Sequence, residues 1–216
     1  MTKFGVSQSV RRKEDVRLLK GEGRFIDDIA PPDALHASFL LSPVAHANIL
    51  TVETGAALDV DGVHAVCTAE SLAAAGVTHR MMVDLLPDDE SPVPDPARPI
   101  LARNKVRFVG EPVALVVADT LSAARDAAEA IIVDYEELSP HLELAAGGEA
   151  LHREAPDNVS FDWRAGDPEG VAAAFASADK TVTLTIADNR IIVAAMEPRG
   201  CLASWNRGRL RFAWNG

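Results

Sequence analysis

The segment 189–200, NRIIVAAMEPRG, holds the residues whose types and spacing come nearest to a chemical site. Its polar residues surround an apolar run and are Asn189, Arg190, Glu197 and Arg199. In an extended chain Glu197 and Arg199 lie two positions apart on one face, and Pro198 interrupts strand pairing between them. We therefore predict a structural ion pair between Glu197 and Arg199, at a polar strand end that faces a partner or a cleft.

Histidines offer little evidence of a metal site. The six are scattered and none forms an HxxxH or HExxH pattern: His36, His46, His64, His79, His141 and His152. His36 and His46 lie in or beside an expected hairpin and could approach each other. Ordinary packing or a surface position is the favoured interpretation, because a zinc site needs several converging ligands.

The carboxylates and cysteines also give little evidence of a catalytic or metal site. Acidic residues are adjacent at Asp27–Asp28, Glu136–Glu137 and Asp88–Asp89–Glu90, and adjacent side chains of a strand point to opposite faces. Cys67 and Cys201 form no CxxC. Neither a nucleotide-binding glycine motif nor a GxSxG elbow is present. We assign no catalytic, cofactor-binding or metal-ligating residue in this chain.

Charge excludes several classes of partner. The 216 residues carry 21 Lys and Arg against 32 Asp and Glu, a formal net charge of −11. Nucleic acids and anionic membranes are disfavoured partners, because both require clustered cations. The basic N-terminus, with Arg11, Arg12 and Lys13, lacks the apolar stretch of a signal peptide, and no apolar run is long enough to span a membrane. We expect a cytoplasmic protein.

The elements that would position these residues alternate between strands and helices. We expect strands over 35–41, 48–54, 63–68, 106–120, 131–138 and 180–192, and a hairpin of 201–205 with 209–214 around the turn NRG. The run VALVVA within 106–120 is nearly continuously apolar, so we expect it to be buried on both faces. The strand–helix–strand order from 106 to 138 predicts a helix packed on a sheet. We expect helices over 69–76 and 121–131 and after Asp167–Pro168, with a helical turn over 55–58 that Thr54 can cap. Five prolines predict a long surface loop over 77–99.

The last predicted strand would leave an apolar edge. Leu210, Phe212 and Trp214 alternate along it, and an open apolar edge favours association. We expect the final sheet to be completed by another polypeptide segment.

Five segments together resemble a known family. They occur in this order: SVRRKEDVRLLKGEGRFIDDI (9–29), ALHASFLLSPVAHANI (34–49), ARNKVRFVGEPVALVVADT (102–120), VDYEELSP (133–140) and NRIIVAAMEPRGCLASW (189–205). The chain resembles the N-terminal part of the molybdopterin-binding large subunit of the xanthine dehydrogenase, aldehyde oxidase and aerobic carbon monoxide dehydrogenase family.

The resemblance implies an α+β fold with four regions. These are an N-terminal arm (1–19), an α/β hammerhead domain (20–138), a linker (139–160) and the incomplete first molybdopterin-binding domain (161–216), which begins a mixed-sheet cofactor domain.

The resemblance also implies an oxidoreductase that hydroxylates a carbon centre with water or oxidises carbon monoxide. The complete enzyme would use molybdenum with molybdopterin or its cytosine dinucleotide form, together with iron–sulfur and possibly FAD subunits. The family's glycine-rich segment and base glutamate have no counterpart in this sequence. We therefore expect no cofactor on this chain alone, and an inactive chain that needs the remaining molybdopterin-binding segment or subunit. The alternative is a non-catalytic assembly or binding module that reuses the hammerhead fold.

Overall fold

The computed structural model describes residues 11–77, 80–81, 98–160, 162, 164–189 and 191–215. Contacts divide the chain into two compact units. The sheet unit is 35–181, and the terminal unit combines 1–34 with 182–216. Helices and antiparallel sheets together make an α+β chain, as the sequence predicts. Within the described ranges, none of the helices has the length and apolarity that crossing a bilayer requires.

The first sheet of the sheet unit is built around its most apolar strand. β7 (Pro112–Ala118) lies between β1 (His36–Leu41) and β3 (Val63–Thr68), antiparallel to both. β7 contains VALVVA, with every residue buried or half-buried. This confirms the prediction that VALVVA is covered on both faces. The predicted strand 106–120 is nevertheless divided, because only 112–118 forms β7 and Val106 belongs to another strand.

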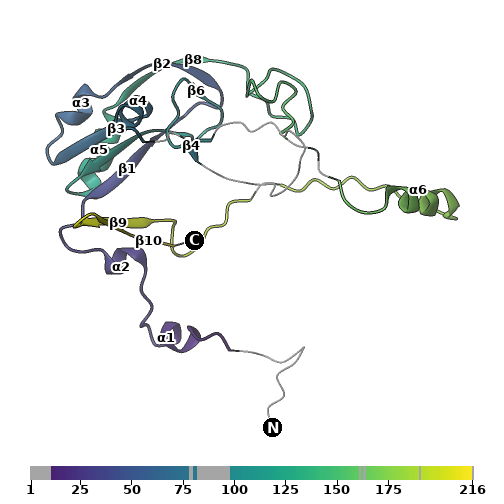
Figure 1. The fold of residues 1–216 in the computed structure, drawn as a ribbon, viewed down its shortest axis with the longest axis horizontal. Helices are drawn as coiled ribbons and strands as arrows, with labels where there is room; N and C mark the ends of the chain where they lie inside the picture. The colour runs from purple at the N-terminus through teal and green to yellow at the C-terminus, as the bar shows by residue number, and fades with distance from the viewer. Residues whose placement is uncertain are drawn as a thin grey trace, which may run out of the picture. The chain divides into compact units, whose positions relative to one another are not determined.

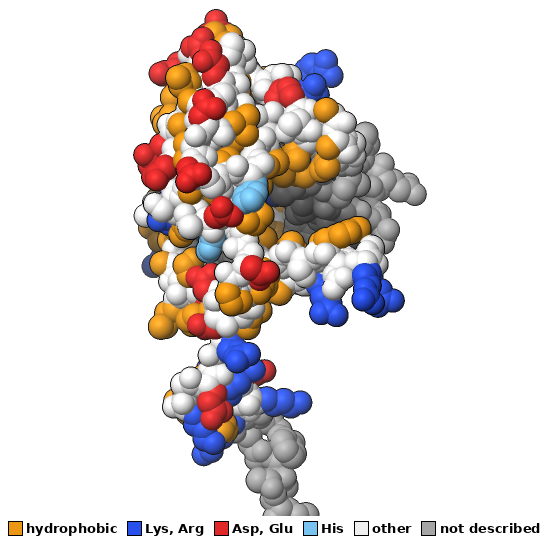
Figure 2. Space-filling model, turned by 90° about the vertical axis from the view of Figure 1, so that its left-hand side faces the viewer, with side chains coloured by type: hydrophobic (Ala, Val, Ile, Leu, Met, Phe, Trp, Pro, Cys, Tyr) orange, Lys and Arg blue, Asp and Glu red, His pale blue; other side chains and the backbone are white. Residues whose placement is uncertain are grey.

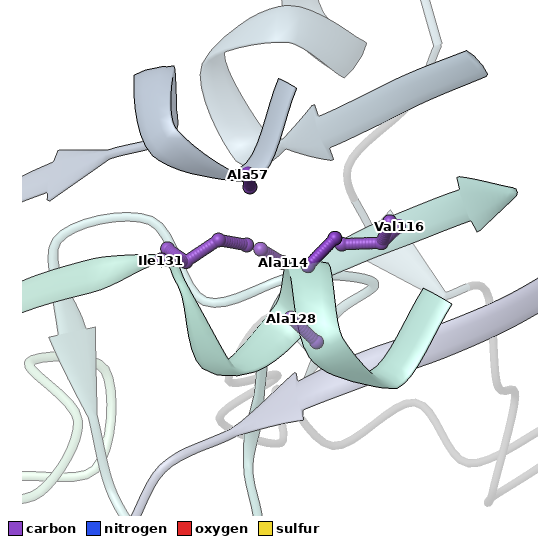
Figure 3. Packing of buried hydrophobic residues seen from close by; sticks show 6 residues of the cluster. Ala57, Ala114, Val116, Ala128 and Ile131 are labelled. Atoms are coloured by element: carbon purple, nitrogen blue, oxygen red, sulfur yellow. The ribbon is translucent and has the colours of Figure 1, made fainter. Parts of the chain in front are cut away.

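Helix α5 (Leu121–Glu129) covers this sheet by packing against β1 and β7 (Figure 1). The Oγ1 of Thr120 accepts a hydrogen bond from the backbone N–H of Ala123 at 3.1 Å and so caps the helix. Its inner face is formed by small alanines, which let the helix approach the strands closely. The shared core is shown in Figure 3 and contains Ala57, Ala114, Val116, Ala127, Ala128 and Ile131.

A second sheet has the order β6 (Lys105–Val106), β2 (Ala47–Glu53) and β8 (Ile132–Glu137). Its buried cluster contains Ala47, Ala102 and Val106 together with Val113 of β7. The predicted helix on a sheet is confirmed, because α5 packs against β1 and β7 of the first sheet. In the structure β7 and β8 belong to different sheets, so α5 leads the chain from one sheet to the other.

Short elements surround the two sheets. These elements are α3 (Gly55–Leu58), α4 (Ala69–Ala74), β4 (Arg80–Met81) and β5 (Arg98–Pro99). Thr54 precedes α3 without donating or accepting a capping side-chain bond, whereas the Oγ1 of Thr68 accepts from the Ser71 N–H at 3.3 Å at the start of α4. The pairing of β4 with β5 brings the two ends of the predicted proline-rich loop together. The prolines at 87, 92, 94 and 96 lie outside the described residues.

Helix α6 (Pro168–Ser177) begins as its sequence predicts, because Asp167 Oδ1 accepts from the Gly170 N–H at 2.9 Å. Its apolar stripe is not buried: Val171 and Phe175 are both more than half exposed.

The terminal unit holds α1 (Asp15–Leu19), α2 (Ile26–Ile29) and the hairpin of β9 (Cys201–Asn206) with β10 (Arg209–Trp214). The hairpin turn is the predicted NRG, in which Arg207 and Gly208 both have positive φ angles, 47° and 76°. Figure 2 shows Lys and Arg side chains gathered around the N-terminal segment, where Arg11, Arg12, Lys13, Arg17 and Lys20 are exposed.

The predicted strand over 180–192 is wrong for the described residues of that segment, which form neither a strand nor a helix. Val182, Leu184 and Ile186 are each at least three-quarters exposed. Alternation of apolar and polar residues predicts a strand only where a neighbouring strand supplies the ladder, and the described part of the chain supplies none to this segment.

Candidate functional site

Three polar residues are buried in the described part of the chain, and all three come from two of the sequence segments quoted above. They are Ser42 and His46 from SPVAHANI and Glu111 from VRFVGEPVA, and each is less than 5% exposed. The two segments are joined through the backbone, because the Ser42 N–H donates to the Glu111 carbonyl at 2.9 Å and the Gly110 N–H donates to the Ser42 carbonyl at 2.8 Å. We call these three residues with Tyr135 the polar hub.

Glu111 is an ionisable group held inside the protein. Its Oε2 accepts the backbone N–H of Arg107 at 2.5 Å. Burial raises the pKa of Glu111 above its ordinary value, and the N–H bond and charge of Arg107 only partly oppose this. The Arg107 N–H gives this buried acid a backbone hydrogen-bond donor, and a buried polar group requires such a partner.

His46 is fixed by one ring nitrogen and left with one free. Its Nδ1 lies 2.8 Å from the carbonyl oxygen of Ser139. A carbonyl only accepts, so Nδ1 carries the proton and Nε2 of the neutral ring is an acceptor. The buried Nε2 has no hydrogen-bond partner among the described residues.

Tyr135 brings a second buried polar atom to the hub. Its hydroxyl has no partner of good geometry among the described side chains. Burial raises the pKa of Tyr135, and the neighbouring Ser42 hydroxyl opposes this. The Ser42 hydroxyl itself donates to the Val44 carbonyl at 2.8 Å.

Arg107 connects the hub to the loop that follows β8. Its Nε donates to the Leu151 carbonyl at 2.8 Å. The Asn158 side chain closes this loop: its Oδ1 accepts from the Leu151 N–H, and its Nδ2 donates to the carbonyls of Gly147 and Glu149, each at 2.9 Å.

His152 follows Leu151 in this loop. Burial is the main cause that lowers its pKa, and the positive charge of Arg107 lowers it further, whereas the negative charge of Glu154 raises it.

The hub therefore joins two sheets and a loop. The Ser42 hydroxyl, His46 Nδ1 and the Glu111 carboxylate all bond to backbone atoms of the same unit, whereas His46 Nε2 and the Tyr135 hydroxyl have no partner among the described residues. We interpret it as a structural centre.

The structure does not bring the histidine pair together as candidate ligands. His36 begins β1 of the first sheet and is exposed, whereas His46 is buried beside β2 of the second sheet. Within the ranges described, no three His, Cys, Asp or Glu side chains are grouped so as to hold a metal ion. His79 and the acidic run 88–90 lie outside these ranges.

The acidic pairs have separate roles. Glu136 accepts from Asn48 Nδ2 at 2.7 Å across β2 and β8, and Asp28 accepts the Phe25 backbone N–H at 2.8 Å in the terminal unit.

The predicted ion pair between Glu197 and Arg199 is wrong. Glu197 Oε1 instead accepts the backbone N–H of Ile26 at 2.8 Å, from a residue 171 positions away in the sequence. A carboxylate next to an unsatisfied amide at the start of a helix gains a charge-assisted hydrogen bond, whereas Arg199 is exposed to water. Arg190 lies outside the described residues.

Comparison with known proteins decides the family. The family model for the aldehyde oxidase and xanthine dehydrogenase a/b hammerhead domain matches residues 20–139. The chain belongs to the aldehyde oxidase and xanthine dehydrogenase family. A second model, for the molybdopterin cofactor-binding domain, matches residues 151–214 of this family member.

The relatives are longer proteins of the same family. The chain is 36% identical to the nicotine 6-hydroxylase large subunit of Paenarthrobacter nicotinovorans, over 98% of this chain and 26% of that protein. It is 34% identical to the carbon monoxide dehydrogenase large chain of Hydrogenophaga pseudoflava, over 90% of this chain and 25% of that protein. The chain thus spans about a quarter of the length of these relatives.

A solved structure extends the likeness to the fold. Quinoline 2-oxidoreductase from Pseudomonas putida 86 superposes with a TM-score of 0.73 and is 33% identical, over 95% of this chain and 26% of that one.

The polar hub does not suit the family's molybdopterin group. A phosphate-bearing pterin needs converging donors around a space. The side chains that converge here, in the polar hub, are buried against their own backbone. We derive no chemistry on that group from this chain.

Sequence reasoning missed the hub, although its signal was present. Ser42, His46 and Glu111 are polar residues directly before or after apolar strands, and polar groups that are buried at such places are satisfied by hydrogen bonds. Arg107 could not be identified in this way, because its partner lies 44 positions away in a loop without regular structure.

Proposed function

We propose that this chain supplies the α/β hammerhead scaffold and the opening strands of the first molybdopterin-binding domain in the large subunit of a molybdenum hydroxylase. The complete enzyme would hydroxylate a carbon centre with water, or oxidise carbon monoxide. Consecutive matches to both family domains support this proposal. The boundaries that go with it are an arm to residue 19, the hammerhead domain to 138, a linker to 160 and the cofactor domain from 161.

The apolar face of the β9–β10 hairpin is the structural observation that carries the proposal. Cross-strand pairing places Trp205 opposite Leu210, Ala203 opposite Phe212 and Cys201 opposite Trp214, so these six side chains share one face. The four large ones are 52–72% exposed. Phe212 and Trp214 stack with ring centroids 5.6 Å apart.

Such a hairpin is incomplete as a sheet. An isolated two-stranded hairpin is marginally stable in water, and further strands or a packed helix are needed to cover its apolar face. The other face carries Arg209 and Arg211 together with Leu202 and Ala213, which are the half-buried residues of the hairpin. We propose that the polypeptide corresponding to the rest of the relatives' large subunit covers the aromatic face and provides the groups that hold the molybdopterin, in the cytosine dinucleotide form or without it.

The remaining parts of the proposal concern partners and location. Two relatives are named as the large chain of carbon monoxide dehydrogenase and as subunit gamma of the 6-hydroxypseudooxynicotine dehydrogenase complex. By analogy, iron–sulfur and FAD subunits would receive the electrons, and the assembly would be cytoplasmic. The chain alone would be inactive, because the base next to the metal and the pterin-binding groups would lie in the completing polypeptide.

Co-expression tests the proposal. The chain is produced alone and together with a polypeptide segment that corresponds to the rest of the relatives' large subunit, both in a host that makes the cofactor. Molybdenum is measured by mass spectrometry after purification, and Trp205 and Trp214 are followed by fluorescence in a Trp163→Phe background.

The expected result is stoichiometric molybdenum and blue-shifted tryptophan emission only for the pair. Stoichiometric molybdenum on the chain alone would overturn the proposal. A chain that stays metal-free and does not associate with the completing polypeptide would favour the non-catalytic assembly or binding module.

A further inference from the structure

Glu197 and Ile26 make a contact that the proposed function does not explain. The Glu197 Oε1 accepts the Ile26 backbone N–H at 2.8 Å. Both residues are half-buried, and Glu197 is the only residue of 191–200 that is not exposed. The contact therefore shields one particular carboxylate in an otherwise solvated segment.

The chain around Glu197 is held from its other side by Asn215. The Asn215 Nδ2 donates to the Pro198 carbonyl at 2.7 Å, and its Oδ1 accepts from the Gly200 N–H at 2.6 Å. A Cβ at Gly200 would lie 3.9 Å from Ile26 Cγ2, so the Gly200 backbone approaches the Ile26 side chain closely. The turn 197–200 thus lies between the start of α2 and the end of β10.

This contact joins the two family domains. Ile26 lies in the hammerhead match, 20–139, and Glu197 in the cofactor-domain match, 151–214. The contacts of the molecule place residues up to 34 with 182–216 and separate them from 35–181. The first residues of the hammerhead match therefore pack with the cofactor-domain match.

We propose that Glu197 is a positioning residue that fastens the leading segment of the hammerhead match onto the strands that open the cofactor-domain match, through its acceptor oxygen. This inference goes beyond the proposed function and requires no molybdenum chemistry. The neighbouring amide provides an internal control, because the Phe25 N–H donates to Asp28 Oδ2 at the same distance of 2.8 Å. Two adjacent amides thus have two different carboxylate partners, one remote and one local.

Amide hydrogen exchange in the full chain, followed by NMR, tests this assignment. Glu197→Ala is expected to speed exchange of the Ile26 amide about tenfold, from the loss of a hydrogen bond to a charged group, and to leave the Phe25 amide unchanged. Asp28→Ala is expected to speed exchange of the Phe25 amide and to leave the Ile26 amide unchanged. Glu197→Gln keeps an acceptor oxygen of the same reach and is expected to restore Ile26 protection to within a few-fold of the wild type.

Trypsin cleavage after Arg24 gives a second readout that does not depend on assignment of the amide. Glu197→Ala is expected to accelerate this cleavage, and Glu197→Gln is expected to stay near the wild-type rate. Ile26→Pro removes the donor and is tolerated at the first helical position. It is expected to accelerate cleavage as Glu197→Ala does, and the double variant is expected to add nothing further.

Two results would overturn the assignment. One is an unchanged Ile26 exchange rate in Glu197→Ala. The other is a Glu197→Gln variant as unprotected as the alanine variant, which would mean that the charge and not the acceptor oxygen matters. Neither measurement involves the metal, so a failure here is distinguishable from a failure of the proposed function.

Discussion

The guanidinium Nε of Arg107 lies 2.8 Å from the carbonyl oxygen of Leu151 and joins the sheet containing β6 to the loop after β8. The backbone N–H of the same Arg107 binds Glu111 inside the polar hub. One residue therefore contributes to the hub through its main chain and to the loop through its side chain. Substitutions at Arg107 can separate the two roles, because a side-chain change leaves the N–H in place.

Arg107→Met is expected to lower the free energy of unfolding by about 2 kcal/mol, since a carbonyl loses a charged hydrogen-bond donor while the aliphatic stem is kept. Urea unfolding measures the change. Arg103→Met is the matched control, because the Arg103 side chain is 48% exposed and lies 3.8 Å from Glu70. It is expected to cost at most about 0.5 kcal/mol. Equal losses for the two variants would contradict a special role for Arg107.

The pKa of His152 is expected to lie below its ordinary value of 6.5, because burial first and the Arg107 charge second both disfavour the imidazolium. The Arg107→Met variant should therefore raise the pKa of His152, and Arg103→Met should leave it unchanged. NMR titration of the ring protons follows both. Because the folded state binds this proton less readily than the unfolded chain, the stability contribution of His152 is present above pH 6.5 and is lost as the pH falls through the lowered pKa. A His152 pKa at or above 6.5 in the wild type would refute the account.

The buried Glu111 gives stability the opposite dependence on pH. Its pKa is raised by burial, so the folded state holds this proton at pH values where the unfolded chain has released it. Stability is therefore expected to fall as the pH rises from 4.5 through the raised pKa, and to stay lower above it. Glu111→Gln cannot titrate and should flatten this part of the curve of unfolding free energy against pH. A Glu111→Gln curve parallel to the wild type would show that Glu111 ionises as it does in the unfolded chain.

Local sequence signals predicted the elements whose causes are local. The run VALVVA became the central strand β7, Thr120 and Asp167 cap their helices, and Arg207–Gly208 makes the hairpin turn. Each outcome depends on residues within a few positions. The family's own motifs added the hammerhead assignment, which the match over 20–139 confirms.

The failures have non-local causes. The alternating segment 180–192 needs a neighbouring strand, which alternation cannot reveal. Glu197 and Arg199 are the right types for an ion pair at the right spacing, but the Ile26 amide is the partner of Glu197. The separation of β7 and β8 into two sheets depends on how β2 and β1 pair, a choice made by the whole unit.

His46 supports the last prediction, because it is buried to 98% and holds the Ser139 carbonyl through Nδ1. His46→Ala is expected to destabilise the protein by about 3 kcal/mol, because the substitution leaves a cavity and removes the hydrogen-bond donor of the Ser139 carbonyl. His36→Ala, at an exposed position of β1, is the matched control and should change the free energy of unfolding by less than about 0.5 kcal/mol.

The unpartnered Nε2 of His46 allows a second test. His46→Asn can keep one hydrogen-bond donor near the Ser139 carbonyl and removes the ring nitrogen that has no partner. We expect His46→Asn to be more stable than His46→Ala in urea unfolding. If alanine and asparagine are equally destabilising, the bond to Ser139 contributes nothing, and the role of His46 is to fill space.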